Sequence, residues 1–181
     1  MRVLIDACVL YPTVMREVLM GVAAQGVFDP LWSARILEEW ARAAARIGDG
    51  YEDVARGEIA LLKARWPKAE ISHAPDLEAS LYLPDPDDTH VLASAIAGKA
   101  DILLTMNLKD FPTRTVSEHG VVRRDPDSLL REMFDEDPET VQQVAENVRV
   151  VAEQLSGTPQ DMRKLMKKAR LPRLGKALVA P

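Results

Sequence analysis

Carboxylate side chains stand beside short apolar segments at several points of this sequence. Asp6 directly follows the run Val3-Leu4-Ile5, and a second acidic segment at residues 85–88 directly precedes a helical pattern. Two carboxylates about 4 Å apart repel each other by about 4 kcal/mol at an effective dielectric constant of 20. A group of acids therefore persists by holding a proton or by binding a hard divalent cation. The candidate residues are Asp6, Glu39 or Glu38, Asp88 with Asp85 and Asp87, Asn107, and Asp110.

Any one of these acids, taken alone, is more often a helix cap or a surface charge. Several acids converging on one edge of a sheet are harder to explain in that way. Oxygen-only ligands suit Mg²⁺ or Mn²⁺, with water filling the remaining positions. Such a cation activates water and neutralises charge on a phosphodiester, so the acids as a group predict metal-dependent phosphoryl chemistry.

The elements that must position these acids alternate between strands and helices. Buried strands are predicted at 3–5 and 101–105, with a short extended piece near residue 71 and a weaker strand at 121–122. This alternation predicts an α/β domain with a largely parallel sheet, in which binding sites lie at the carboxyl ends of strands. Four helices are predicted beside these strands. One begins after Pro12 and ends near Gly26, one extends from the Ser33 cap to about residue 48, one covers 52–66 with Val54 facing inward, and one covers 89–97.

After about residue 136 the sequence pattern predicts helices and no further strands. Asp137 caps a helix with a regular valine stripe that ends at Gly157, and Thr158 opens a last helix. We therefore predict an α/β domain over residues 1–135 and a helical extension over 136–181. Residues 159–181 carry seven basic residues against one acid, whereas the other 158 residues carry 16 basic and 27 acidic ones. A compact basic end can bind phosphates, an acidic partner or the chain's own acidic body. If it binds an RNA backbone, the possible contacts are Lys164, Lys167, Lys168 and Arg170.

Composition excludes several classes of protein. With 181 residues, 47% of them apolar, the chain forms a core of ordinary size and is not largely disordered. Its single cysteine excludes an internal disulfide framework and a cysteine-clustered zinc site. The N-terminus lacks a signal-peptide core, and no segment approaches the ~20 apolar residues that cross a bilayer. We expect a soluble, cytoplasmic protein with no membrane contact.

Four blocks of sequence resemble the PIN-domain nucleases. The blocks are Val-Leu-Ile-Asp-Ala-Cys-Val-Leu at 3–10, Ser33 with Ile-Leu-Glu-Glu-Trp at 36–40, Asp-Pro-Asp-Asp-Thr-His-Val-Leu-Ala-Ser-Ala at 85–95, and Leu-Thr-Met-Asn-Leu-Lys-Asp-Phe-Pro at 104–112. The chain resembles in particular the VapC-type ribonuclease toxins of bacterial toxin–antitoxin pairs. The likeness covers residues 1 to about 130, and the C-terminal helices resemble an extension found on a subset of these toxins. It implies a PIN-like three-layer domain with a central parallel sheet.

The resemblance also implies a set of metal ligands. Asp6, Glu39 and Asp88 would hold one or two Mg²⁺ or Mn²⁺ ions. The fourth acidic position of the family falls on Asn107, which keeps an oxygen ligand and loses the charge, and Asp110 could restore that charge. Thr105 would support the site through its hydroxyl. The apolar stripe of helix 33–48 leaves Glu38 and Glu39 equally at its margin, and only the family pattern favours Glu39.

The function implied by the resemblance is metal-dependent hydrolysis of RNA as the toxin of a type II pair. A cognate antitoxin and a homodimer are implied with it.

Two other hypotheses stay open at this point. Asp6 as a phosphorylated nucleophile is one, although the haloacid-dehalogenase pattern needs an acid at position 8, where Cys8 stands. A catalytically weakened PIN fold that binds a partner or RNA is the other, with Asn107 marking a site being lost. His90 is expected to be a capping or surface residue, and Trp66 to be packing.

Overall fold

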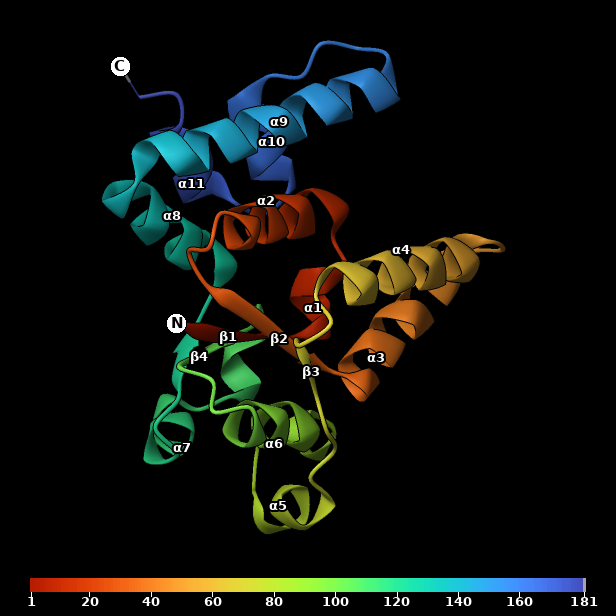
Figure 1. The fold of residues 1–181 in the computed structure, drawn as a ribbon, viewed down its shortest axis with the longest axis vertical. Helices are drawn as coiled ribbons and strands as arrows, with labels where there is room; N and C mark the ends of the chain where they lie inside the picture. The colour runs from red at the N-terminus through yellow and green to blue at the C-terminus, as the bar shows by residue number, and fades with distance from the viewer. Residues whose placement is uncertain (181) are drawn as a thin grey trace. The chain divides into compact units, whose positions relative to one another are not determined.

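The structure is a computed structural model that describes residues 1–180 (Figure 1). It divides into two compact units. The first comprises Met1–Tyr11 and Phe28–Arg124, and the second comprises Pro12–Val27 and the chain from Asp125 onward. All of the predicted carboxylate and amide ligands belong to the first unit. The predicted functional boundary at residue 135 stays a prediction, because compactness does not test where an activity resides.

A five-stranded sheet runs through the first unit. Its strands are β1 (Arg2–Ile5), β2 (Asp29–Ser33), β3 (Glu70–Ile71), β4 (Ile102–Leu104) and β5 (Val122–Arg124). They lie in the order β3-β2-β1-β4-β5, and every neighbouring pair is parallel. With helices flanking this sheet, the predicted α/β architecture with a central parallel sheet and extra C-terminal helices is confirmed.

The apolar strands at the centre of the sheet are fully buried, as expected for a parallel sheet covered on both faces. Val3, Leu4 and Ile5 have no exposed surface. The sequence did not predict β2, because Pro30 within a short segment argues against a strand: proline has no N–H to donate to a neighbour. In the structure Pro30 lies opposite Val3 near the start of β2, and Leu31 and Trp32 continue the strand into the core.

The helices of the first unit begin largely where the sequence predicted them. Ser33 caps α3, its hydroxyl accepting a hydrogen bond from the amide of Ile36 at 3.3 Å. Helix α6 is buried along most of its length and packs on β1, β2 and β4. The prediction that Val54 faces inward was wrong, since its side chain is 62% exposed. The elements are α1 (Ala7–Leu10), α3 (Ala34–Ala45), α4 (Tyr51–Arg65), α5 (Pro75–Ser80), η1 (Pro86–Asp88), α6 (Thr89–Ala97), η2 (Leu108–Asp110) and α7 (Thr113–Glu118).

The second unit is helical. Asp137 caps the longest helix, as predicted, by accepting a hydrogen bond from the amide of Thr140 at 3.1 Å. The cap of the next helix is Asp161 rather than Thr158, and the single last helix that we predicted is two short ones. Sequence also did not indicate that α2 packs on α8 and α9. The helices are α2 (Thr13–Ala24), α8 (Pro126–Glu136), α9 (Pro138–Ser156), α10 (Met162–Lys168) and α11 (Pro172–Ala177).

None of the helices within residues 1–180 has both the length and the apolar character needed to span a bilayer.

A close approach between α2 and α9 gives a first prediction. A Cβ atom at Gly21 would lie 2.5 Å from Cγ1 of Val144, a β-branched side chain with little rotamer freedom in a helix. We expect Gly21→Ala to lower stability by about 1–3 kcal/mol through overpacking, although glycine-to-alanine changes inside helices usually stabilise by about 1 kcal/mol. Thermal unfolding measures the effect.

Two further variants control this experiment. Gly57 lies in α4 with no atom within 4 Å of its would-be Cβ, so Gly57→Ala should raise the melting temperature. Adding Val144→Ala to Gly21→Ala should recover part of the loss by making room for the new methyl group. Equal gains from Gly21→Ala and Gly57→Ala would contradict the close approach.

Candidate metal centre

The register of two central strands brings the first two site residues together. Ile5 pairs with Leu104, so the next residues along β1 and β4 are Asp6 and Thr105. The Asp6 amide donates to the Leu104 carbonyl at 3.0 Å, which continues the pairing one step past the strands. Thr105 is fully buried, and its Oγ1 donates to Asp6 Oδ2 at 2.7 Å. The Thr105 hydroxyl therefore holds one carboxylate oxygen of Asp6, Oδ2, in place.

A chain of hydrogen bonds continues from Thr105 to the second acidic segment. Thr105 Oγ1 accepts a bond from the Asn107 amide at 3.0 Å. The Asn107 side chain then donates through Nδ2 to Asp88 Oδ2 at 3.2 Å. Asn107 thus bridges the loop after β4 to the start of α6. An aspartate at position 107 would have no amide hydrogen to donate to Asp88, so Asn107 joins these two segments in a way that an acid does not.

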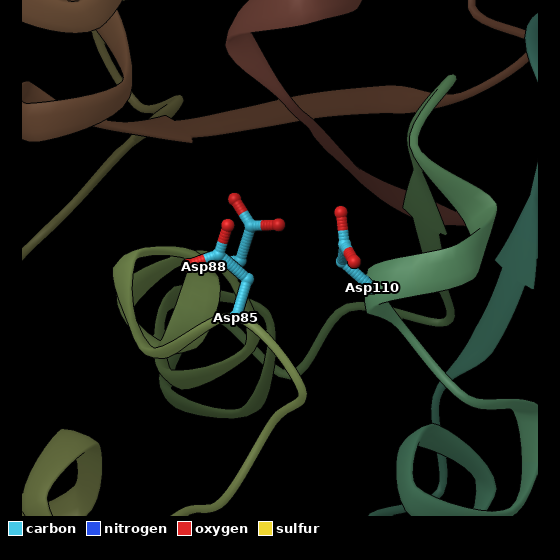
Figure 2. Close-up of side chains that lie close together, drawn as sticks. All are labelled: Asp85, Asp88 and Asp110. Atoms are coloured by element: carbon cyan, nitrogen blue, oxygen red, sulfur yellow. The ribbon is translucent and has the colours of Figure 1, made fainter.

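Three carboxylates converge beside this chain (Figure 2). One oxygen from each of Asp85, Asp88 and Asp110 lies within 4.8 Å of the others. Asp85 is the N-cap of the η1 turn and Asp88 is its last residue, whereas Asp110 comes from η2. Arg123 of β5 holds the η2 loop in place by donating to the backbone carbonyls of Leu108 and Phe111. Asp110 therefore faces the α6 side of the site because its loop is tied to the sheet.

Mutual repulsion is visible at the centre of this group. The pKa of the Asp88 carboxyl is raised from 3.8 to about 6, first by its partial burial and then by the negative charges of Asp6, Asp85, Asp110 and Glu39. All four of these acids are therefore close enough to act on Asp88. A divalent cation would remove the repulsion that the proton now relieves.

Glu39 and Glu38 occupy different surroundings, which separates the two alternatives left open by the sequence. Glu38 forms ion pairs with Arg42 and Arg56 at 3.1 and 3.0 Å. Glu39 lies beside the site, with Oε1 2.8 Å from Nε2 of His90. Its position supports Glu39 over Glu38 as the acid that acts on Asp88.

His90 is not the capping or surface residue that the sequence suggested. Its side chain is 3% exposed, because it lies on the first turn of α6 against the core. Although Nε2 is close to Glu39 Oε1, the contact departs from hydrogen-bond directions, and neither ring nitrogen has a hydrogen-bond partner within residues 1–180. We read the pair as a close polar contact that orients Glu39 rather than as a hydrogen bond.

Cys8 is a neighbour of the site and has no character of a nucleophile. Its thiol donates to Asp6 Oδ2 at 3.1 Å and accepts from the Met106 amide at 3.3 Å. Burial and the negative charge of Asp6 raise the pKa of the thiol to about 12. The sulfur is therefore protonated at neutral pH, in keeping with a small packed residue.

The structure thus brings together the predicted residues Asp6, Glu39, Asp88, Thr105, Asn107 and Asp110. The predicted ligand set omitted Asp85, although the run Asp-Pro-Asp-Asp had pointed to it as a companion of Asp88. The donors are carboxylate and amide oxygens, and burial together with the neighbouring acids raises the pKa of Asp88, so the group suits a hard divalent cation. Which of these residues hold the cation stays a prediction. The basic residues Lys164, Lys167, Lys168 and Arg170 belong to the second unit.

Comparison with known families agrees with this geometry. A family model described as "PIN domain" matches residues 2–109. The chain therefore belongs to the PIN-domain family, whose members are generally metal-dependent nucleases. No curated protein and no solved structure matched the chain. The matched segment contains Asp6, Glu39, Asp88 and Asn107, and it ends one residue before Asp110.

The raised pKa of Asp88, caused by burial and by the neighbouring acids, predicts a stability effect in the metal-free protein. Because its pKa is about 6 when folded and 3.8 in a model peptide, the folded state holds the proton more tightly. The stability that this contributes is present below pH 4 and is lost as the pH rises through 6. At pH 7.5 in EDTA, Asp88→Asn should therefore stabilise the protein, by on the order of 1 kcal/mol after allowing for solvent screening. The melting temperature should rise by about 2–4 °C.

Asp87→Asn is the matched control for this measurement. Asp87 lies in the same turn but outside the acidic cluster. It should not reproduce the gain, and the gain of Asp88→Asn should disappear at pH 4. A lower melting temperature for Asp88→Asn at pH 7.5 would show that repulsion does not dominate at this carboxylate.

Thr105 gives a separate prediction about the positioning of Asp6. Thr105→Val keeps the approximate shape of the side chain and removes the hydroxyl that holds Asp6 Oδ2. We expect Mn²⁺ affinity, measured by isothermal titration calorimetry, to fall about tenfold, the lower end of what outer-shell partners of a metal site contribute. Thr105→Ser keeps the hydroxyl and should bind nearly as the parent does. Equal affinities for all three proteins would refute a positioning role.

Proposed function

We propose that this chain is an endoribonuclease that hydrolyses RNA phosphodiester bonds with the help of Mg²⁺ or Mn²⁺. The proposal is carried by the convergence of Asp85, Asp88 and Asp110, whose ligand oxygens lie within 4.8 Å of one another. This convergence occurs at the carboxyl ends of strands in a PIN-domain chain, where α/β proteins bind ligands. The resemblance to VapC-type toxins supports RNA as the substrate.

In this mechanism the acidic side chains supply a negatively charged oxygen surface for the cation. Bound there, Mg²⁺ or Mn²⁺ supplies Lewis-acid chemistry at the phosphodiester. Asp6, Asp88 and Glu39 are the proposed holding groups, with Asp110 contributing charge across the site and Asn107 an oxygen. Thr105 and Cys8 keep Asp6 in one orientation by donating to the same oxygen, Oδ2.

RNA cleavage tests the proposal directly. The purified protein is incubated with a mixed RNA pool in Mn²⁺ or Mg²⁺, with EDTA as the metal-free control. We expect metal-dependent cleavage that Asp6→Asn and Asp88→Asn each reduce at least about 100-fold, because each removes a charge from the site without changing side-chain size. Asp87→Asn should cleave at the parental rate, since Asp87 lies outside the cluster. Circular dichroism confirms that the variants are folded.

Three results would count against the proposal. Cleavage that persists in EDTA would exclude a metal mechanism. Equal losses in Asp87→Asn and Asp88→Asn would show that general charge, rather than the cluster, supports activity. Absence of cleavage together with absence of Mn²⁺ binding at millimolar concentration would favour the alternative of a weakened PIN fold that binds a partner or RNA. Asn107 motivates that alternative, because it replaces an acid of the broader family.

We further propose that the chain is the toxin of a type II toxin–antitoxin pair in the cytoplasm. The resemblance to VapC-type toxins is the support for this role, for a cognate antitoxin that covers the acidic site, and for a homodimer. Co-expression with the protein encoded beside it in the genome, followed by purification, tests the first two. Light scattering of the purified chain tests the third.

Basic residues of helix α10, together with Arg170 two residues after its end, are the proposed contacts to RNA phosphates. Lys164, Lys167, Lys168 and Arg170 are all exposed, and none forms an ion pair within residues 1–180. Contacts of this kind release counterions, so RNA affinity should fall as salt rises, and the slope should decrease when these residues are neutralised.

A further inference from the structure

A pocket of the first unit opens at the amino-terminal edge of the sheet and has a volume of about 410 Å³. Arg2 begins β1 and Asp29 begins β2, and both line this pocket. Asp6, in contrast, follows the last residue of β1. Four strand residues at about 3.3 Å each separate the two edges by about 13 Å. The pocket therefore lies outside the candidate metal centre.

Backbone hydrogen bonds hold the frame of this pocket. Pro67 follows the end of α4 and prevents the helix from continuing. The Ala69 amide then donates to the Trp66 carbonyl at 3.1 Å, and the Trp32 amide donates to the Ala69 carbonyl at 3.0 Å. On the other wall, the Arg2 amide donates to Asp101 Oδ2 at 2.7 Å. The segments that carry the lining side chains are thus tied to the sheet.

Three cationic side chains line the pocket without acidic partners. Arg2, Arg65 and Lys68 form no ion pair within residues 1–180, even with Asp29 of the same lining. Other arginines on α3 and α4 are neutralised, as Arg42 and Arg56 are by Glu38. In a chain of formal net charge −5, unpaired cations gathered around one hollow create a local positive potential. The pocket therefore favours an anion, and arginine forks suit phosphate oxygens.

Trp66 adds an aromatic surface to this cationic lining. It is half-buried and lines the pocket, whereas Trp32 and Trp40 are at most 2% exposed. Its indole Nε1 has no hydrogen-bond partner within residues 1–180. Leu31 supplies an apolar wall next to the ring. A partly exposed indole beside cations is the combination on which nucleic-acid bases stack while their phosphates are bound.

We propose that this pocket binds a nucleotide unit, with the base on Trp66 and the phosphate held by Arg2, Arg65 and Lys68. The unit is either a free mononucleotide or one nucleotide of an RNA strand, since both present the same base and phosphate. Binding here does not require the metal centre, so it is independent of cleavage. An acidic peptide satisfies the cations and leaves the ring face unused, which is why the nucleotide is the better match.

Tryptophan fluorescence of the full chain in EDTA tests the proposal. EDTA chelates divalent cations, so the acidic site cannot carry out metal-dependent cleavage of the probes. The probes are AMP, adenosine, a short RNA with 2′-O-methyl groups that resists hydrolysis, and poly-glutamate. AMP should quench the fluorescence saturably, because Trp66 is the accessible indole, and Trp66→Leu should abolish the quenching. Adenosine should bind about tenfold more weakly, since it lacks the phosphate.

Arg65→Gln and Arg46→Gln are a matched pair for this experiment. Both arginines are exposed, but Arg65 ends α4 and lines the pocket, whereas Arg46 follows the end of α3 and is not among the lining residues. Arg65→Gln should weaken AMP binding about tenfold and Arg46→Gln should not change it. Competition between AMP and the methylated RNA would assign the pocket to an RNA strand, and binding of AMP alone would assign it to a free nucleotide. Equal effects of the two substitutions, no saturable quenching by either probe, or tighter binding of poly-glutamate would overturn the proposal.

Discussion

The parallel pairing of β1 with β4 is the constraint on which the site depends. Because Ile5 pairs with Leu104, the two chains leave the sheet side by side, and Asp6 lies against the Thr105 hydroxyl. Asn107 extends this contact to Asp88 at the start of α6. A shift of β4 by one residue in this register would turn the Thr105 side chain to the opposite face of the sheet, away from Asp6. The burial of β1 and β4 therefore specifies the site as well as the core.

The same arrangement stores electrostatic repulsion that the fold must overcome. Five acids meet in one small region, and both burial and the charges of the other four raise the pKa of Asp88. Neutral donors relieve part of the repulsion: Thr105, Cys8 and Asn107 give hydrogen bonds to Asp6 or Asp88. A cation would relieve the rest. Stability and function are thus opposed at this site in the metal-free state, as in many sites that bind hard cations.

The acidic and the cationic sites lie at opposite edges of one sheet and differ in chemistry for a structural reason. At the carboxyl edge, strands end in acids that the loops draw together. At the amino edge, the corner made by Trp66 and Pro67 brings Arg65 and Lys68 to the beginning of β1, where Arg2 stands. An otherwise acidic chain thereby keeps positive potential on a defined part of its surface.

Local sequence determined much of this protein, because helix caps, apolar runs and acids beside them are short-range signals. These signals were sufficient for the α/β class, for strands β1 and β4, for the caps Ser33 and Asp137, and for the acids to examine. The sequence did not predict strand β2, because a segment containing Pro30 becomes a strand only through its pairing with β1 and β3.

The surroundings of several site residues depend on the tertiary structure alone. It gave Glu38 and Glu39 different surroundings, added Asp85 to the acidic cluster, and buried His90. Each of these outcomes depends on which distant segment packs against the residue. Distances between side chains far apart in the chain are set by strand register and loop anchoring, and no periodicity in a single sequence encodes them.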